Sequence, residues 1–491
     1  MEQKKQEAHF VLLPFMAQGH MIPMVDTARL LAKRNLTVTI LISPYNLNRI
    51  KPIIDRAIAS GSNIRISHLR FPTVEVGLPE DCESLDMVRS SEDHSRFHKA
   101  IDLLQSQVEQ ALRTLDPPPT CIISDLFYPW STPLATRLGI PRFVFHVLGC
   151  FTLLCMNMLA VSQGFKDIDV PDTEYFALPG LPDRVEITKA QIKGTAGQVP
   201  SWWTELVDRI EDAYSEASGI VVNTFEELEP AYVRRYAETL GMEVWCVGPV
   251  SLCNEDELDK AQRGNNEASI DGGECLKWLD AQDPASVVYV CLGSLSSLTA
   301  SQLVELGLGL EASGRPFVWV VRRSTSNEEL ELVSWLGRFE ERVRGKGLVI
   351  HGWAPQVMIL SHPSVGGFVT HCGWNSTLEG TTSGVPMMTW PVFADQFCNE
   401  KFIVNVVGTG VRAGVEVPVM FVGEKDKGGV QVKSEVVKAA IEELMDGGEK
   451  GRERRERARE LGKKARRAME KGGSSYINMT RLIRLVEGQL G

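Results

Sequence analysis

The sequence is poor in the features that mark nucleic-acid-binding, disulfide-bonded and zinc-binding proteins. Its 52 lysines and arginines are outnumbered by 63 aspartates and glutamates, which gives a formal charge of -11. A chain of this charge repels polyanions, which argues against nucleic acids and anionic membranes as main partners. The ten cysteines include no CxxC pair, and several, such as Cys121 and Cys150, lie in apolar runs. Free buried thiols in a reducing compartment explain them better than disulfides or zinc ligands do.

Targeting and membrane-spanning signals are also weak. Residues 1–7 are charged and lead into only a short apolar stretch, so we expect no signal peptide and a cytoplasmic location. Residues 143–165 contain no Asp, Glu, Lys or Arg and are long enough to cross a bilayer. Because polar residues such as His146 and Asn157 interrupt this segment, we favour a buried strand followed by a buried helix, with no integral membrane segment.

Strand–helix alternation predicts an α/β protein. The 491 residues exceed the roughly 100–200 of a usual domain, and 43% are hydrophobic, which is enough for more than one core. An apolar run at residues 10–15, a turn at 17–19 and a stripe of apolar residues at helical spacing up to Leu31 predict a strand–helix unit. Further strands are expected at residues 36–42, 64–69, 120–124, 142–145 and 244–249, with a helix near 97–115.

A polar, charged stretch at residues 254–273 separates this first series from a second one. The second series has expected strands at residues 287–292, 317–321, 348–350, 367–370 and 386–390. We therefore predict two doubly wound parallel sheets. The predicted domains are residues 1–250, a linker at 251–274, residues 275–470, and a helix at 471–491 that packs back on the N-terminal domain.

Residues 450–471 are dense in arginine and glutamate, which could suggest a nucleic-acid-binding helix. The two signs alternate, as in Arg452, Glu453 and Arg454. Alternation is more typical of a solvent-exposed helix face.

One segment concentrates polar residues at the expected ends of strands, where open parallel sheets bind ligands. It begins Trp353-Ala354-Pro355-Gln356, contains His371-Cys372-Gly373-Trp374-Asn375-Ser376 and Glu379, and ends Asp395-Gln396. We expect the chain to turn through Gly373 into a helix whose first residues, Asn375 and Ser376, are good N-caps. Free N–H groups there would suit a diphosphate. Taken alone, the pattern is more typical of an ordinary capped helix.

The 44 positions from Trp353 to Gln396 resemble the signature box of the plant UDP-dependent glycosyltransferases. Other segments fall where that family has similar ones: Gly19-His20, Ser124-Asp125, residues 176–182, residues 223–225, Gly248-Pro249 and Leu292-Gly293-Ser294. The resemblance covers most of the chain. It implies the GT-B architecture, in which two Rossmann-like domains face each other across a cleft.

The resemblance also implies a donor site for UDP-glucose as co-substrate, with no cofactor. The implied residues are Gly19, Ser294, Trp353, Ala354, Gln356, His371, Gly373, Trp374, Asn375, Ser376, Glu379, Asp395 and Gln396. Trp353 would stack on uracil, while Gln356 and Glu379 would hold the ribose. The diphosphate would lie against His371, Asn375, Ser376 and Ser294, and the sugar against Trp374, Asp395 and Gln396. A glutamine at the last position accompanies glucose in this family.

By the same resemblance, His20 would be the general base and Asp125 its orienting partner. A neutral imidazole can take the proton of an alcohol as the alcohol attacks the anomeric carbon, which would invert the sugar from α to β. Asp125 would fix the tautomer of the imidazole and stabilise the imidazolium. Alone, His20 is more typical of a local hydrogen bond at a helix start and Asp125 of an N-cap. No spacing of metal ligands is apparent.

The acceptor pocket is expected in the N-terminal half, as an apolar lining with few polar anchors. The expected lining residues are Phe15, Met16, Phe127, His146, Trp202 and Trp203, although these side chains could equally belong to the core. Resemblance to the subgroup acting on triterpenoids, steroids, flavonoids and hormones implies a small hydrophobic acceptor. We expect a monomer.

Three other functions are compatible with an α/β chain of this kind. A nicotinamide-dependent oxidoreductase is disfavoured because the first strand–helix turn, Met16 to His20, has no GxGxxG pattern. A non-catalytic ligand binder is disfavoured because His20 and Asp125 are both present. Another UDP-sugar stays open, because one or two contacts decide sugar choice.

Overall fold

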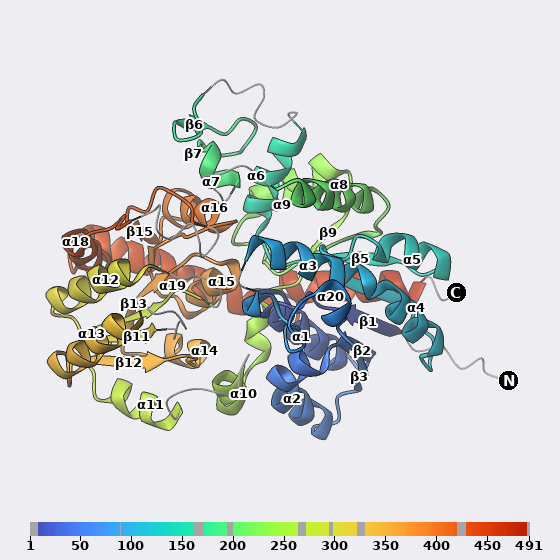
Figure 1. The fold of residues 1–491 in the computed structure, drawn as a ribbon, viewed down its shortest axis with the longest axis horizontal. Coiled ribbons are helices and arrows are strands. Elements are labelled where there is room, and N and C mark those ends of the chain that lie inside the picture. The colour runs from blue at the N-terminus through green and yellow to red at the C-terminus, as the bar shows by residue number, and fades with distance from the viewer. Residues whose placement is uncertain are drawn as a thin grey trace.

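Two parallel sheets organise the protein (Figure 1). The computed structural model describes residues 8–88, 90–161, 170–193, 200–263, 272–293, 298–321, 329–419 and 429–488. The N-terminal sheet has the strand order β3-β2-β1-β4-β5-β8-β9, and the C-terminal sheet has the order β12-β11-β10-β13-β14-β15. Every strand pair in both sheets is parallel. The predicted pair of doubly wound parallel sheets is confirmed.

The N-terminal sheet and its helices extend to residue 246. The elements are β1 (His9–Leu13), α1 (Gln18–Ala32), β2 (Thr37–Ile42), α2 (Pro44–Ala59), β3 (Ile64–His68), η1 (Val74–Val76), η2 (Leu85–Met87), α3 (Ser91–Leu103), α4 (Gln105–Thr114), β4 (Cys121–Asp125), α5 (Ser131–Leu138), β5 (Arg142–His146), α6 (Cys150–Val161), an antiparallel hairpin β6 (Tyr175–Ala177) and β7 (Glu186–Thr188), α7 (Lys189–Lys193), α8 (Ser201–Ser215), β8 (Gly219–Val222), α9 (Pro230–Leu240) and β9 (Val244–Cys246).

The C-terminal sheet follows a short helical connection. The elements are η4 (Val250–Cys253), α10 (Glu257–Gln262), α11 (Gly272–Asp280), β10 (Val287–Cys291), α12 (Ala300–Ser313), β11 (Phe317–Val321), α13 (Glu329–Arg342), β12 (Gly347–His351), α14 (Gln356–Leu360), β13 (Val365–Thr370), α15 (Trp374–Ser383), β14 (Met387–Thr389), α16 (Gln396–Lys401), the π-helical η5 (Phe402–Val406), β15 (Gly410–Arg412), α18 (Ser434–Leu444), α19 (Glu449–Met469) and α20 (Ser474–Gly488).

The central strands form because their residues are apolar enough to be covered on both faces. Every residue of β1, β4 and β13 is buried. Strands of parallel sheets with helices on both faces read as nearly continuous apolar runs, which is why these strands could be predicted.

The structure refines the expected elements in three places. The helix expected at residues 97–115 is two helices, α3 and α4, which meet at Leu104. Strands β6, β7, β8 and β15 were not predicted. The long apolar segment folds as β5 followed by α6, and no helix among the described residues is long and apolar enough to cross a membrane.

The last helix returns to the N-terminal sheet, where it lies beside the blue elements in Figure 1. Asn478 donates from Nδ2 to the carbonyl of Cys246 at 3.2 Å, and Ser475 donates to the carbonyl of Gly248. The guanidinium of Arg34 lies 3.6 Å from the ring centroid of Tyr476. These contacts join α20 to β9 and to the turn that follows α1, while the domain boundaries themselves stay a prediction.

Candidate active site

The strand order of each sheet reverses at one point, and several of the predicted site residues, such as His20, Asp125 and His371, follow the strands at these two points. In the N-terminal sheet β1 pairs with β4, and in the C-terminal sheet β10 pairs with β13. The connections that follow the two strands of such a pair run to opposite sides, which opens a crevice beyond the carboxyl ends of the strands. The topology therefore provides one crevice on each sheet.

His20 and Asp125 meet at the N-terminal crevice. His20 lies in the first turn of α1, after β1, and Asp125 is the last residue of β4. The Nδ1 atom of His20 lies 2.7 Å from Oδ2 of Asp125, and the two side chains are 21% and 0% exposed. This bond leaves Nε2 of the imidazole as the nitrogen that can accept a proton from a substrate.

Hydrogen bonds to both the side chain and the backbone hold Asp125 in place. Its Oδ1 accepts from the backbone N–H of Phe127 at 3.1 Å. Arg142, which is bonded to Ser124 and Thr132, also reaches the backbone carbonyl of Asp125 at 3.3 Å. Burial lowers the pKa of Arg142 to about 10, and the guanidinium stays positively charged near neutral pH. A carboxylate fixed in this way can orient an imidazole without being displaced.

The start of α15 lies at the C-terminal crevice, but its cap differs from the expectation. The N-cap position is Gly373, and the helix begins at Trp374, so Asn375 and Ser376 are not the capping residues. No side chain caps the helix. The first intrahelical bond of this turn is donated by Thr377, to the carbonyl of Gly373 at 3.0 Å. The preceding N–H groups therefore have no intrahelical acceptor and suit an anion.

His371 lies beside this helix start because two glycines leave room for its ring. A Cβ atom on Gly293 or on Gly373 would lie 2.4 Å from a ring atom of His371. Gly293 also has φ of +79°, a conformation that L side chains rarely adopt. Ser294, predicted to contact the diphosphate, lies outside the described residues.

The residues predicted to hold the ribose are bonded to one another. Gln356 donates from Nε2 to Oε2 of Glu379 at 2.7 Å and lies 3.0 Å from Oγ of Ser376. Oε1 of Glu379 accepts from Arg263. Trp353 is half-buried, and its indole N–H has no hydrogen-bond partner among the described residues. Ala354, the next residue, is buried. Arg263 was not predicted, because nothing distinguishes it within a polar segment.

Asp395 and Gln396 lie at the end of a bent loop. Ala394 has φ of +53°, and Gln396 accepts from the backbone N–H groups of Val392 and Phe393 at 2.7 and 3.1 Å. Burial raises the pKa of Asp395 to about 6, although a 2.6 Å hydrogen bond from Asn399 acts in the opposite direction. Gln396 is buried and shapes this loop through its Oε1 atom.

Hydrogen bonds join the two halves beside these crevices. Asn375 donates from Nδ2 to the carbonyl of Gly19 at 2.6 Å, directly before His20. The indole of Trp374 donates to the carbonyl of Asn223 at 2.7 Å and is only 2% exposed. The expectation that Trp374 faces a sugar therefore cannot apply to its indole side chain, which packs in the contact between the halves. Only its backbone N–H remains available there.

Aromatic rings surround His20. Phe15 and Phe127 have ring centroids 5.3 and 5.6 Å from that of His20, and Trp203 lies 6.1 Å from Phe127. Trp202 lies 5.6 Å from Trp203. Four of the six predicted acceptor residues thus form one group beside the imidazole, which we call the aromatic cluster: Phe15, Phe127, Trp202 and Trp203.

The other two predicted acceptor residues belong to the core. Met16 is fully buried, and so is Phe15 of the aromatic cluster, whereas Phe127, Trp202 and Trp203 are partly exposed. His146 is buried and bonded to the hydroxyl of Tyr214, and burial lowers its pKa to about 3. Met16 and His146 were predicted to line a pocket because they lie near the ends of apolar strands, but both side chains are buried in the structure.

His98 joins the aromatic cluster and was missed by the sequence analysis. Its ring stacks on Phe15 at 5.7 Å and lies 5.4 Å from Trp202. Burial lowers its pKa to about 3, so it is neutral, and its Nδ1 has no hydrogen-bond partner among the described residues. A histidine within an apolar helix stripe gives no signal that could separate it from a core residue.

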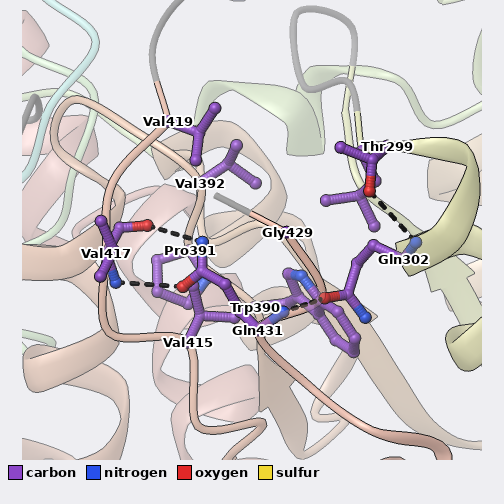
Figure 2. Close-up of a pocket in the computed structure, with 11 residues that line it drawn as sticks. Thr299, Gln302, Trp390, Pro391, Val392, Val415, Val417, Val419, Gly429 and Gln431 are labelled. Carbon is purple, nitrogen blue, oxygen red and sulfur yellow. Dashed lines mark hydrogen bonds between the residues drawn. The ribbon is translucent and has the colours of Figure 1, made fainter. Parts of the chain in front are cut away.

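A small pocket lies apart from these residues, beside the start of α12 (Figure 2). It is lined by Leu298, Thr299, Gln302, Trp390, Pro391, Val392, Val415, Val417, Val419, Gly429 and Gln431. None of the predicted site residues lines it. Among the described residues there is also no cluster of three His, Cys, Asp or Glu side chains that could hold a metal ion.

Comparisons with known proteins give a consistent result. The sequence model of the family described as UDP-glucoronosyl and UDP-glucosyl transferase matches residues 266–421. The chain is 54% identical to UDP-glycosyltransferase 73E1 of Stevia rebaudiana over 484 residues, which cover 97% of this chain and 96% of that protein.

Solved structures share the whole fold. UGT73P12 of Glycyrrhiza uralensis, complexed with glycyrrhetinic acid 3-O-monoglucuronide, superposes with a TM-score of 0.90 at 37% identity and covers 98% of this chain and 96% of its own. UGT71G1 of Medicago truncatula, complexed with UDP-glucose, superposes with a TM-score of 0.79 at 26% identity, and the match covers 99% and 100% of the two chains.

Proposed function

The chain belongs to the plant UDP-glycosyltransferases, and from this premise we propose that it transfers glucose from UDP-glucose to a hydroxyl group of a small hydrophobic acceptor. Its architecture is GT-B, its reaction is glycosyl transfer and its donor is a UDP-sugar. Glucose, the class of the acceptor and the role of His20 are the parts that we propose. The observation that carries the proposal is the 2.7 Å contact between His20 and Asp125, at the crevice that Asn375 joins to the helix start.

The chain's residues suit an inverting displacement. The acceptor oxygen attacks the anomeric carbon while Nε2 of His20 takes its proton, and the bond from that carbon to the phosphate oxygen breaks. The electron pair leaves with UDP, whose charge the N–H groups at the start of α15 stabilise. Asp125 keeps the proton on Nδ1 and stabilises the imidazolium that forms. We assign no metal or cofactor to this step.

The aromatic cluster supports a bulky apolar acceptor. Its rings lie beside His20, and the ring of His98 packs among them. The similar Glycyrrhiza uralensis protein was solved with glycyrrhetinic acid 3-O-monoglucuronide, which favours a triterpenoid within the expected range of triterpenoids, steroids, flavonoids and hormones. The free cysteines, nearly all buried, support a cytoplasmic location, which with a monomeric state stays a prediction.

A transfer assay tests the proposal. The purified protein is incubated with UDP-glucose, UDP-galactose or UDP-glucuronic acid and a panel of triterpenoid, steroid and flavonoid acceptors, and UDP release and product mass are followed. We expect the highest rate with UDP-glucose, and a loss of about 10²- to 10⁴-fold in the His20→Ala variant. His68→Ala, which removes an exposed imidazole at the end of β3, should leave the rate unchanged. Tight UDP binding without product from any donor would favour a non-catalytic binder.

A further inference from the structure

Arg263 connects the two halves of the molecule next to the predicted ribose site. It is the residue that follows α10, and its side chain is 8% exposed. Its Nε donates to Oδ2 of Asp26 on α1 at 2.8 Å, and its Nη1 donates to Oε1 of Glu379 on α15. One guanidinium therefore bridges a carboxylate from each half.

The helix that precedes Arg263, α10, is anchored by further charged groups. Asp259 of α10 accepts from Arg29 of α1 and, at 2.9 Å, from Nε of Arg56 of α2. Asn254 donates to Asp26 at 3.1 Å. These bonds fix α10 on the N-terminal half, so the position of the guanidinium is set before any ligand binds.

The carboxylate of Glu379 keeps part of its hydrogen-bonding capacity. An ionised carboxylate offers about four lone-pair sites. Arg263 takes one at Oε1 and Gln356 takes one at Oε2, at 2.7 Å. About two sites remain, which matches the two adjacent hydroxyl groups of a ribose.

We propose that Arg263 is a positioning residue for the nucleotide: it holds Glu379 in the orientation that accepts hydrogen bonds from the ribose hydroxyls. The inference rests on the proposed function and adds a residue outside the signature segment. A buried carboxylate without a partner would be costly to keep charged, and Arg263 provides that partner. Burial alone would lower the pKa of Arg263, but Asp26 and Glu379 raise it, so the guanidinium is always charged.

Comparison of UDP with 2′-deoxy-UDP tests this role, because the two ligands differ only in one ribose hydroxyl. Dissociation constants are measured by calorimetry for the wild type, Arg263→Ala and Arg263→Lys. The wild type should prefer UDP by about 10- to 100-fold, the value of a hydrogen bond to a charged group. Arg263→Ala should reduce the preference below about threefold. Arg263→Lys should also reduce it, because one ammonium group cannot reproduce the fork that spans both carboxylates.

Arg56→Ala is the matched control. It removes an arginine that docks the same helix through Asp259 but does not touch Glu379. This variant should keep the preference for UDP even if it lowers the melting temperature. If Arg263→Ala does not fold, Arg263→Lys decides the outcome.

The outcomes separate the inference from the function on which it rests. A wild type that does not bind UDP contradicts the proposed function. A wild type that binds both ligands equally, or Arg263 variants that keep the full preference, overturns only the role of Arg263.

Discussion

The imidazole of His20 is partly open to solvent, whereas its partner carboxylate is fully buried. This difference assigns the roles of the two side chains. The open ring can reach a substrate, and Asp125, held by the N–H of Phe127 and by Arg142, can only act through the ring. The residue that meets the acceptor and the residue that orients it are therefore distinct.

Replacement of Asp125 by asparagine tests this division. The amide keeps nearly the shape of the carboxylate but loses the charge that stabilises the imidazolium, so we expect kcat to fall by about 10²- to 10⁴-fold. The KM for UDP-glucose should change little, because Asp125 does not touch the donor residues. The measurement is steady-state kinetics beside Asp102→Asn, which alters an exposed carboxylate paired with Arg209. Equal losses in both variants would contradict the assignment.

Asp395 predicts a pH dependence of sugar recognition. Burial raises its pKa to about 6, so its carboxylate is ionised at pH 7.5 and about nine-tenths protonated at pH 5. If the carboxylate binds sugar hydroxyls, the affinity advantage of UDP-glucose over UDP should fall by about tenfold over this interval. Calorimetry with both ligands at several pH values measures it. Asp395→Asn should have a small advantage that does not vary with pH, and a wild type without variation would exclude Asp395 as a sugar ligand.

Asp395 should also make the free energy of unfolding depend on pH, with its contribution to stability largest at low pH. Its pKa in the folded protein lies above the ordinary value of 3.8, so the folded state binds the proton more tightly than the unfolded state does. Its contribution to the free energy of unfolding is therefore fully present below pH 3.8 and is lost as pH rises through about 6. Denaturant unfolding of Asp395→Asn should lack this part of the decline that the wild type shows.

At the scale of elements, success in prediction depended on how many apolar residues a strand contains. Strands β1 and β10 are runs of five residues with strong apolar character. Strand β15 is Gly-Val-Arg and does not differ from a loop in composition, whereas β8 is Gly-Ile-Val-Val, a short apolar run that the sequence analysis overlooked. These short strands form because neighbours already in the sheet provide their hydrogen-bond partners.

Prediction of the site residues likewise depended on signals that are local in the sequence. His20, Asp125 and the segment from Trp353 to Gln396 could be located because their motifs are local. Arg263 could not, since its partners Asp26 and Glu379 are 237 and 116 residues away in sequence. The predicted cap of α15 was wrong because the side-chain amide of Asn375 donates to the carbonyl of Gly19, and Gly373 occupies the N-cap position. Contacts between halves override local preference at both places.

The contact between Gly149, which directly precedes α6, and Trp374 gives a prediction at this scale. A Cβ atom on Gly149 would lie 2.5 Å from the ring of Trp374, the first residue of α15. Gly149→Ala should therefore shift the helix start, lower the free energy of unfolding by about 1–3 kcal/mol and weaken UDP binding. Gly337→Ala in α13 meets nothing within 4 Å and should instead raise stability by about 1 kcal/mol. Unchanged UDP affinity in Gly149→Ala would show that Trp374 does not position the helix.

The whole molecule has a hydrophobic core that both halves share. Phe151 of α6 and Tyr232 of α9 contact Phe402, with ring centroids 5.2 and 6.4 Å apart. Beside them, Thr152 donates to Oδ1 of Asn399 at 2.7 Å. Because side chains from both halves exclude water from the same core, we expect the halves to unfold together.

This shared core predicts that UDP, whose proposed contacts lie almost entirely in the C-terminal half, stabilises the N-terminal half as well. At a UDP concentration 100 times its dissociation constant, the gain should be about 2.7 kcal/mol. Hydrogen exchange should show equal added protection for amides of β9 and β13. Phe402→Ala, which removes a ring from the core that the halves share, should cost about 3–5 kcal/mol and confine the added protection to β13 and its neighbours. Added protection confined to the C-terminal half in the wild type would mean that the halves unfold independently despite their common core.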